Sequence, residues 1–143
     1  LGIYYVERGA NQRPSRVIYD RGHSSIAVAS PDWFDWEALF EDADWFHFTG
    51  ITPAISANAA ECCRVALQKA EEKGVTVSCD LNFREKLWRW KPGVKPRDLA
   101  REVMGKLLPQ VDGVIANEAD AADVLGSEVE TLMRGNASGR VVR

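Results

Sequence analysis

Three polar side chains follow a hydrophobic stretch of the chain at steps of two residues. They are Asp80, Asn82 and Arg84. If the chain stays extended here, alternate side chains share one face, so all three point the same way. The guanidinium of Arg84 offers a planar fork of donors that suits a carboxylate. The cluster therefore predicts a binding site, and a structural alternative stays open in which Asp80 and Asn82 bond turn amides and Arg84 pairs with Glu85 or is solvated.

A second candidate pair, Asn117 and Asp120, lies where a helix is predicted to begin. A helix N-terminus favours anions, and a nearby carboxylate can hold a hydrated magnesium ion. An Asn followed by an acid three residues later is also the pattern of a helix cap, which explains the pair without any ligand. Both interpretations stay open at this point.

A third candidate face lies near the start of the chain, where Tyr19 and Arg21 are two residues apart in a predicted strand and share one side of it. Tyr4 has a similar place in the preceding strand. A face of tyrosine and arginine suits a polar ligand, and a solvated strand face is the alternative.

The elements that must position these residues follow from the pattern of apolar side chains. Short runs rich in β-branched and aromatic residues predict three antiparallel strands at 3–7, 16–21 and 25–29. After them, strands and helices alternate, which predicts a parallel sheet with right-handed crossovers and hence an α/β fold. The predicted strands of the sheet are 45–49, 75–81 and 111–116, and the predicted helices are 31–40, 56–73, 96–108, one from 117 and 128–133. Ligands of such sheets bind beyond the carboxyl ends of the strands, where residues 49–50, 80–84 and 117–120 lie.

Length and composition exclude several classes of protein. The chain has 143 residues, of which 45% are hydrophobic, so we expect one domain with a real core. A net charge of −3 argues against nucleic acid as the main partner. No apolar stretch approaches the ~20 residues of a membrane helix. Three cysteines without C-x-x-C spacing are expected to be buried thiols in a reducing cytoplasm.

Four motifs resemble those of the ribokinase-like (PfkB) carbohydrate kinases, and their order and spacing over residues 1–125 fit that family. The string D-x-N-x-R-x-x-L-W that starts at Asp80, together with G-I-T-P-A from Gly50, resembles 2-keto-3-deoxygluconate kinases in particular. The segments 2–4 and 16–21 are similar to that subfamily as well, and N-E-A-D-A from Asn117 resembles the N-x-x-E element of the whole family.

The resemblance implies a three-layer α/β/α fold with a parallel central sheet and a small β-sheet lid. Residues 1–30 would be lid strands, and residues 31–143 part of the α/β core, one domain truncated at both ends. Family members transfer a phosphoryl group from ATP, with Mg²⁺, to a sugar hydroxyl. The subfamily implies that 2-keto-3-deoxygluconate is converted to its 6-phosphate.

The resemblance also assigns roles to the candidate residues. The lid residues Tyr4, Tyr19 and Arg21 would touch the sugar acid, and Arg84 would pair with its carboxylate. Asn117 and Asp120 would lie near magnesium and the ATP phosphates, with Asp120 reaching the metal through a water molecule.

This chain departs from the family pattern at three points. The acid of the N-x-x-E element is Asp120, whose carboxylate is one methylene shorter than that of Glu. The family's G-A-G-D motif, which supplies the catalytic base, and its Gly/Asp-rich sugar-binding segment do not occur in the sequence. The chain also begins without Met. We therefore expect a fragment of a longer enzyme that is inactive alone.

Two alternatives remain. One is a kinase of the fructokinase or ribokinase type, whose neutral sugar would give Arg84 no carboxylate partner. The other is a non-catalytic binding or dimerisation module whose lid strands pair with another copy to form a homo-oligomer.

Overall fold

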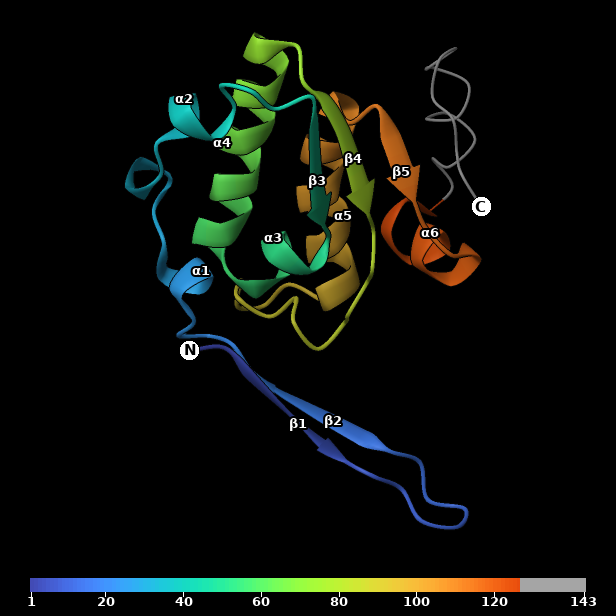
Figure 1. Cartoon of the computed structure of the whole chain (residues 1–143). Coiled ribbons are helices and arrows are strands. Elements are labelled where there is room, and N and C mark those ends of the chain that lie inside the picture. Colours follow the sequence, from blue (N-terminus) through green and yellow to red (C-terminus); the bar gives the residue numbers. More distant parts are fainter. Residues whose placement is uncertain (127–143) are drawn as a thin grey trace.

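The computed structural model describes residues 1–126 and contains two separate β-sheets (Figure 1). A two-stranded antiparallel hairpin projects from a core in which a three-stranded parallel sheet is flanked by helices. The expected α/β architecture with a parallel central sheet and a small separate sheet is thus confirmed. In chain order the elements are β1 (Ile3–Glu7), β2 (Arg16–Asp20), α1 (Ser25–Val28), the 3-10 helix η1 (Pro31–Trp33), α2 (Trp36–Leu39), β3 (Trp45–Thr49), α3 (Ile51–Ile55), α4 (Ala57–Lys73), β4 (Thr76–Asp80), α5 (Pro96–Leu107), the 3-10 helix η2 (Leu108–Gln110), β5 (Gly113–Ile115) and α6 (Glu118–Val124).

The core sheet has the strand order β3-β4-β5, so the chain crosses from each strand to its parallel neighbour through a helix. At the carboxyl edge of the sheet, Asp80 is the register partner of Thr49 on one side and of Ile115 on the other. Backbone hydrogen bonds continue past the strand ends. The Gly50 amide donates to Asp80 O at 2.8 Å, and the Leu81 amide donates to Ile115 O at 2.9 Å. The three strand ends therefore meet in one continuous edge.

Helix α4 forms where the sequence carries both of its end signals and one apolar stripe. The Ser56 hydroxyl accepts a hydrogen bond from the Ala59 amide at 3.0 Å, which caps the first turn. Gly74 ends the helix with φ +68°, a left-handed conformation that glycine adopts without steric cost. The buried stripe consists of Ala59, Cys62, Cys63, Ala66, Leu67 and Ala70.

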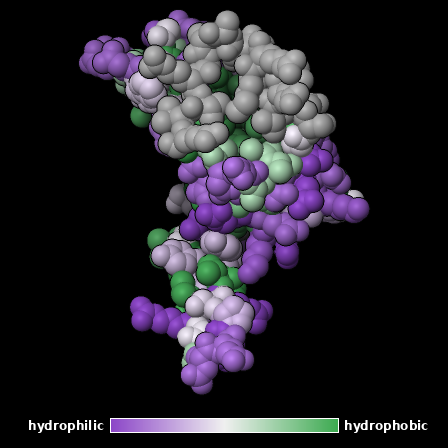
Figure 2. All heavy atoms as spheres, turned by 90° about the vertical axis from the view of Figure 1, so that its right-hand side faces the viewer, coloured by the Kyte–Doolittle hydropathy of each residue, from purple (hydrophilic) through white to green (hydrophobic). Residues whose placement is uncertain are grey.

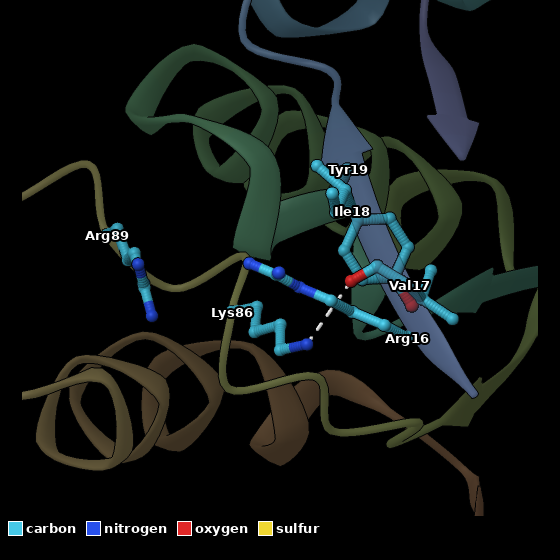
Figure 3. A pocket seen from close by; sticks show the side chains of 6 residues that line it. All are labelled: Arg16, Val17, Ile18, Tyr19, Lys86 and Arg89. Atoms are coloured by element: carbon cyan, nitrogen blue, oxygen red, sulfur yellow. Dashed lines mark hydrogen bonds between the residues drawn. The ribbon is translucent and has the colours of Figure 1, made fainter. Parts of the chain in front are cut away.

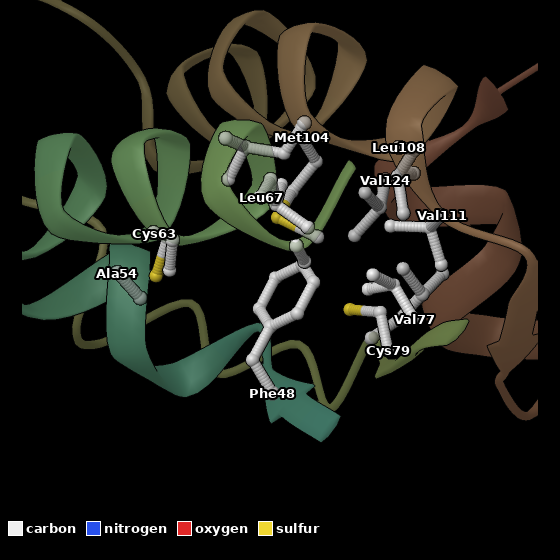
Figure 4. Packing of buried hydrophobic residues seen from close by; sticks show 14 of the residues in the cluster. Phe48, Ala54, Cys63, Leu67, Val77, Cys79, Met104, Leu108, Val111 and Val124 are labelled. Atoms are coloured by element: carbon white, nitrogen blue, oxygen red, sulfur yellow. The ribbon is translucent and has the colours of Figure 1, made fainter. Parts of the chain in front are cut away.

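The hydrophobic core lies between the sheet and helices α4, α5 and α6 (Figure 4). Phe48, Val77 and Cys79 contribute the sheet side, and Leu67 and Met104 meet them from α4 and α5. Because side chains alternate along a strand, the opposite sheet face carries Trp45, which is 64% exposed.

The prediction of a third strand at residues 25–29 is wrong, because residues 25–28 form the short helix α1. This segment packs against α4 instead of joining the hairpin. The Ser56 hydroxyl donates to Ala27 O at 2.7 Å, and the side-chain Nδ2 of Asn58 donates to Val28 O at 3.4 Å. These bonds from the start of α4 satisfy carbonyls that a strand would have paired with a neighbour.

The other predicted elements agree with the structure within a few residues, with one exception. The predicted helix 31–40 is divided into η1 and α2, and Asp35 caps the second piece. The predicted helix 128–133 and the polar tail lie outside the described residues. Within residues 1–126, the helices are too short and too polar for any of them to cross a bilayer.

Candidate functional site

The hairpin brings together three of the candidate residues, Tyr4, Tyr19 and Arg21. The two tyrosines are cross-strand partners in the antiparallel register. The guanidinium carbon of Arg21 lies 5.9 Å from the centre of the Tyr4 ring and 5.3 Å from that of Tyr19. Both distances are within the range of a cation–π interaction, which orients the guanidinium and leaves its N–H groups free to donate. This face can therefore offer two phenolic hydroxyls and one guanidinium to a ligand.

The end of β4 differs from the extended strand that the sequence predicted. Asn82 has φ +36°, so the chain leaves the extended conformation there and residues 80, 82 and 84 do not form one flat face. The Asn82 amide donates to Asp80 Oδ1 at 3.2 Å, and Asn82 Nδ2 donates to Thr49 Oγ1 at 3.5 Å. The alternative in which Asp80 binds a turn amide is therefore what the structure has. Asp80 and Asn82 hold the turn, and their remaining polar atoms lie at the carboxyl edge of the sheet.

Arg84 lies beyond this turn and is exposed. Its Nη1 donates to the carbonyl of Phe83 at 2.9 Å, and among the described residues it forms no ion pair with Glu85. Two residues further, Lys86 Nζ donates to Val17 O of β2 at 3.2 Å. That bond places the segment after β4 beside the hairpin.

Asn117 and Asp120 form the cap that the sequence pattern allowed. Asn117 Oδ1 accepts from the Asp120 amide at 2.7 Å, and Asn117 Nδ2 donates to Asp120 Oδ2 at 3.1 Å. One carboxylate oxygen of Asp120 has no protein partner in these bonds. Across residues 1–126, no three or more His, Cys, Asp or Glu side chains are grouped closely enough to hold a metal ion. The predicted place of Asp120 near magnesium stays a prediction.

The three cysteines are free and buried, as expected. Burial raises the pKa of Cys63 from 9.0 to about 12 and raises that of Cys79 further. A thiol with so high a pKa stays protonated at neutral pH and is a poor nucleophile. The cysteines therefore belong to the core and not to the site.

The structure also reveals a contact that the sequence analysis did not single out. Lys86 and Val17 are 69 residues apart. Lys86 fills a variable position of the string that starts at Asp80, and Val17 lies in the segment 16–21, but neither was assigned a role. Only the position of the hairpin relative to the core brings them together, so no local signal in the sequence could have indicated the pair.

No family model matches the chain. Individual proteins do match it in sequence and in fold. A curated 2-dehydro-3-deoxygalactonokinase from Haloferax volcanii is 42% identical over 124 residues, which are 87% of this chain and 36% of that protein. The crystal structure of a 2-dehydro-3-deoxygluconokinase from Thermotoga maritima superimposes with a TM-score of 0.76 at 48% identity, over 88% of this chain and 36% of that one. A PfkB family carbohydrate kinase from Listeria grayi has a TM-score of 0.76 and 31% identity, over 94% of this chain and 41% of its own. The chain thus spans little more than a third of the length of these proteins.

Proposed function

Because this chain is related in sequence and fold to a segment of the ribokinase-like (PfkB) carbohydrate kinases, we propose that the whole protein transfers a phosphoryl group from ATP to a hydroxyl of a 2-keto-3-deoxy sugar acid. The named relatives act on sugars of the galacto and the gluco configuration. We take the gluco acid, 2-keto-3-deoxygluconate, as the substrate and its 6-phosphate as the product.

The observation that carries the proposal is the cluster of Tyr4, Tyr19 and Arg21 on one face of the hairpin. Phenolic hydroxyls both donate and accept hydrogen bonds, so they complement sugar hydroxyls, whereas a guanidinium complements a carboxylate. The two rings that flank Arg21 also reduce the freedom of its side chain before a ligand arrives. In this proposal, the hairpin of β1 and β2 acts as a lid over the substrate. Helix α1, at the end of the predicted lid segment 1–30, packs on α4 with the α/β core to which residues 31–126 contribute.

Arg84 supplies the second cationic group of the proposed substrate site. Its only hydrogen bond within residues 1–126, to the neighbouring Phe83 carbonyl, is local and exposed. A charge-assisted bidentate pair with a substrate carboxylate is stronger than a neutral hydrogen bond to a carbonyl. Arg84 can therefore exchange one partner for the other when a sugar acid binds.

The proposed nucleotide end of the site lies at Asn117 and Asp120. Magnesium in kinases is held mainly by phosphate oxygens and water, with only one or two carboxylates from the protein. The carboxylate oxygen of Asp120 that Asn117 does not contact fits such an outer position, where it would accept a hydrogen bond from a metal-bound water. Magnesium would neutralise charge on the ATP phosphates. In the proposal, the catalytic base comes from a part of the protein beyond this sequence, because the family's G-A-G-D motif does not occur in it.

A calorimetric titration of this chain with 2-keto-3-deoxygluconate tests the substrate. We expect binding that is weakened tenfold or more in Arg84→Ala, since a hydrogen bond to a charged group contributes about 1.5–3 kcal/mol. Arg64→Ala is the matched control, because Arg64 is an exposed arginine of α4 paired with Glu61. If fructose binds as tightly as the acid and Arg84→Ala changes neither affinity, the sugar-acid assignment is wrong and a neutral-sugar kinase takes its place.

A further inference from the structure

A hollow of about 320 Å³ lies between strand β2 and the segment that follows β4 (Figure 3). We call it the hairpin–core hollow. Val17, Ile18 and Tyr19 line it from the hairpin, together with Arg16. Lys86 and Arg89 line it from the core. In Figure 3, Arg16 extends from β2 across the hollow, and Lys86 points back from the opposite wall toward the strand.

The charge of this lining is unbalanced. Three of the six residues, Arg16, Lys86 and Arg89, are cations, and none is an acid. Within residues 1–126, the eight ion pairs of the protein involve none of these three. The chain as a whole carries a net charge of −3, so this local excess runs against the overall charge. Like charges that converge without a counter-ion repel each other, and an anion placed between them removes that cost.

The donors around the hollow suit an oxyanion. Arg16 and Arg89 each offer a planar fork that matches two oxygens of a phosphate group. Lys86 uses one of its three N–H groups for Val17 O and retains two. In an antiparallel strand the amide and carbonyl of one residue point to the same edge, so the Val17 amide also faces this side of β2. Figure 2 shows hydrophilic side chains gathered on the part of the core nearest the hairpin.

We propose that the hairpin–core hollow binds a small oxyanion with at least two negative charges, such as a phosphate group, and that this anion joins the hairpin to the core. Its volume equals that of about ten water molecules at ~30 Å³ each, which is room for a phosphate group with part of its carrier. One partner of the anion, Arg16, belongs to the hairpin, and the other two belong to the core. Bound anion would therefore fix the position of the hairpin, which a single hydrogen bond from Lys86 otherwise secures at this point. The hollow shares Tyr19 with the proposed substrate site, but neither Arg21 nor Arg84 lines it, and its three cations have no role in that site.

The test is a calorimetric titration of this chain with pyrophosphate, at an ionic strength kept constant with sodium chloride. Arg89→Gln removes one cation from the lining, and we expect it to weaken binding at least tenfold. Lys95→Gln removes one exposed cation elsewhere and is the matched control, with an expected change below twofold. Both are exposed positions, so urea unfolding should give the wild-type midpoint for each variant. Equal weakening in the two variants, or no binding to the wild type, would overturn the proposal.

Three further arms identify the anion and its effect. Comparing the affinities of inorganic phosphate and glucose 6-phosphate shows whether the hollow prefers a free anion or a phosphorylated small molecule. Acetate, with a single negative charge, should bind at least tenfold more weakly than either. Arg84→Ala should bind pyrophosphate as the wild type does. If this variant no longer bound pyrophosphate, the anion would lie in the proposed substrate site, and the proposal for the hollow would be refuted. Pyrophosphate should also slow amide hydrogen exchange in β1 and β2 of the wild type but not of Arg89→Gln. Unchanged exchange in a chain that binds the anion would refute the joining of hairpin and core.

Discussion

Replacing Gly50 with alanine tests whether the carboxyl edge of the sheet is as tightly packed as the structure indicates. Gly50 has φ −59°, which any residue adopts, so its role is not conformational freedom. A Cβ at this position would overlap the carbonyl oxygen of Leu81 and would stand 3.0 Å from its carbonyl carbon. These are backbone atoms, and they cannot move aside as the end of a flexible side chain would.

The cost of Gly50→Ala follows from two effects. Separating the two backbone segments resembles overpacking a core, which costs about 1–3 kcal/mol. The same movement stretches the hydrogen bond from the Gly50 amide to Asp80 O, now 2.8 Å long, whose loss costs about 0.5–1.5 kcal/mol. We therefore expect a loss of about 2–4 kcal/mol in the free energy of unfolding. For a chain of this size that corresponds to a fall of roughly 10 °C in Tm.

Urea unfolding followed by circular dichroism measures this loss, and Gly105→Ala is its matched control. A Cβ on Gly105, within helix α5, would meet nothing within 4 Å. The same glycine-to-alanine change should there increase stability by about 0.5–1 kcal/mol. If Gly50→Ala cost less than about 0.5 kcal/mol, the close approach of residues 50 and 81 would not exist in solution, and the account of the strand ends would be refuted.

Two other predictions concern the core. Ser56→Ala removes the cap on the Ala59 amide and the hydrogen bond to Ala27 O. Urea unfolding should show a loss of about 1–2 kcal/mol in the free energy of unfolding, and almost no loss for the control Ser25→Ala. Equal losses in the two variants would contradict the capping role. Cys63 has a pKa of about 12 when folded and 9.0 as an isolated thiol, so its contribution to stability is complete below pH 9 and is lost as the pH rises above it. Between pH 7 and pH 10, Cys63→Ala should therefore lose about 1.4 kcal/mol less stability than the wild type under reducing conditions, and parallel losses would show that this thiol is not buried in solution.

The sequence predicted the core elements well because each carries its own signals. Helix α4 has a capping serine, an apolar stripe and a terminal glycine, so periodicity and end residues agree. In β4, the apolar Val77 and Cys79 alternate with polar residues, which is the period of a strand. The predicted strand at residues 25–29 failed for the opposite reason. Its few apolar residues fit a strand or a helical turn equally well, and bonds from the start of α4 to Ala27 and Val28 decided the outcome.

The candidate site was predictable residue by residue but not in its local geometry. That Tyr19 and Arg21 share one face follows from strand alternation, as predicted. The pairing of Tyr4 with Tyr19, and hence the approach of Arg21 to both rings, depends on the register of the hairpin. The turn at Asn82 was only the alternative to an extended chain, because alternation along a strand gives no warning of a positive φ. Asparagine tolerates that conformation better than most residues, and its place after Asp80 was the one hint available.

Contacts at the strand ends link the proposed substrate and nucleotide residues mechanically. Asp80 accepts the Gly50 amide through its carbonyl and holds the turn at Asn82 through its carboxylate. The next residue, Leu81, donates to Ile115 O, only two residues before the Asn117 cap. A shift of β4 along its axis would therefore move the segment that carries Arg84 and disturb the start of α6 together. This coupling explains why the close approach at Gly50 concerns function as well as stability, because a bulkier residue there would displace both ends of the proposed site at once.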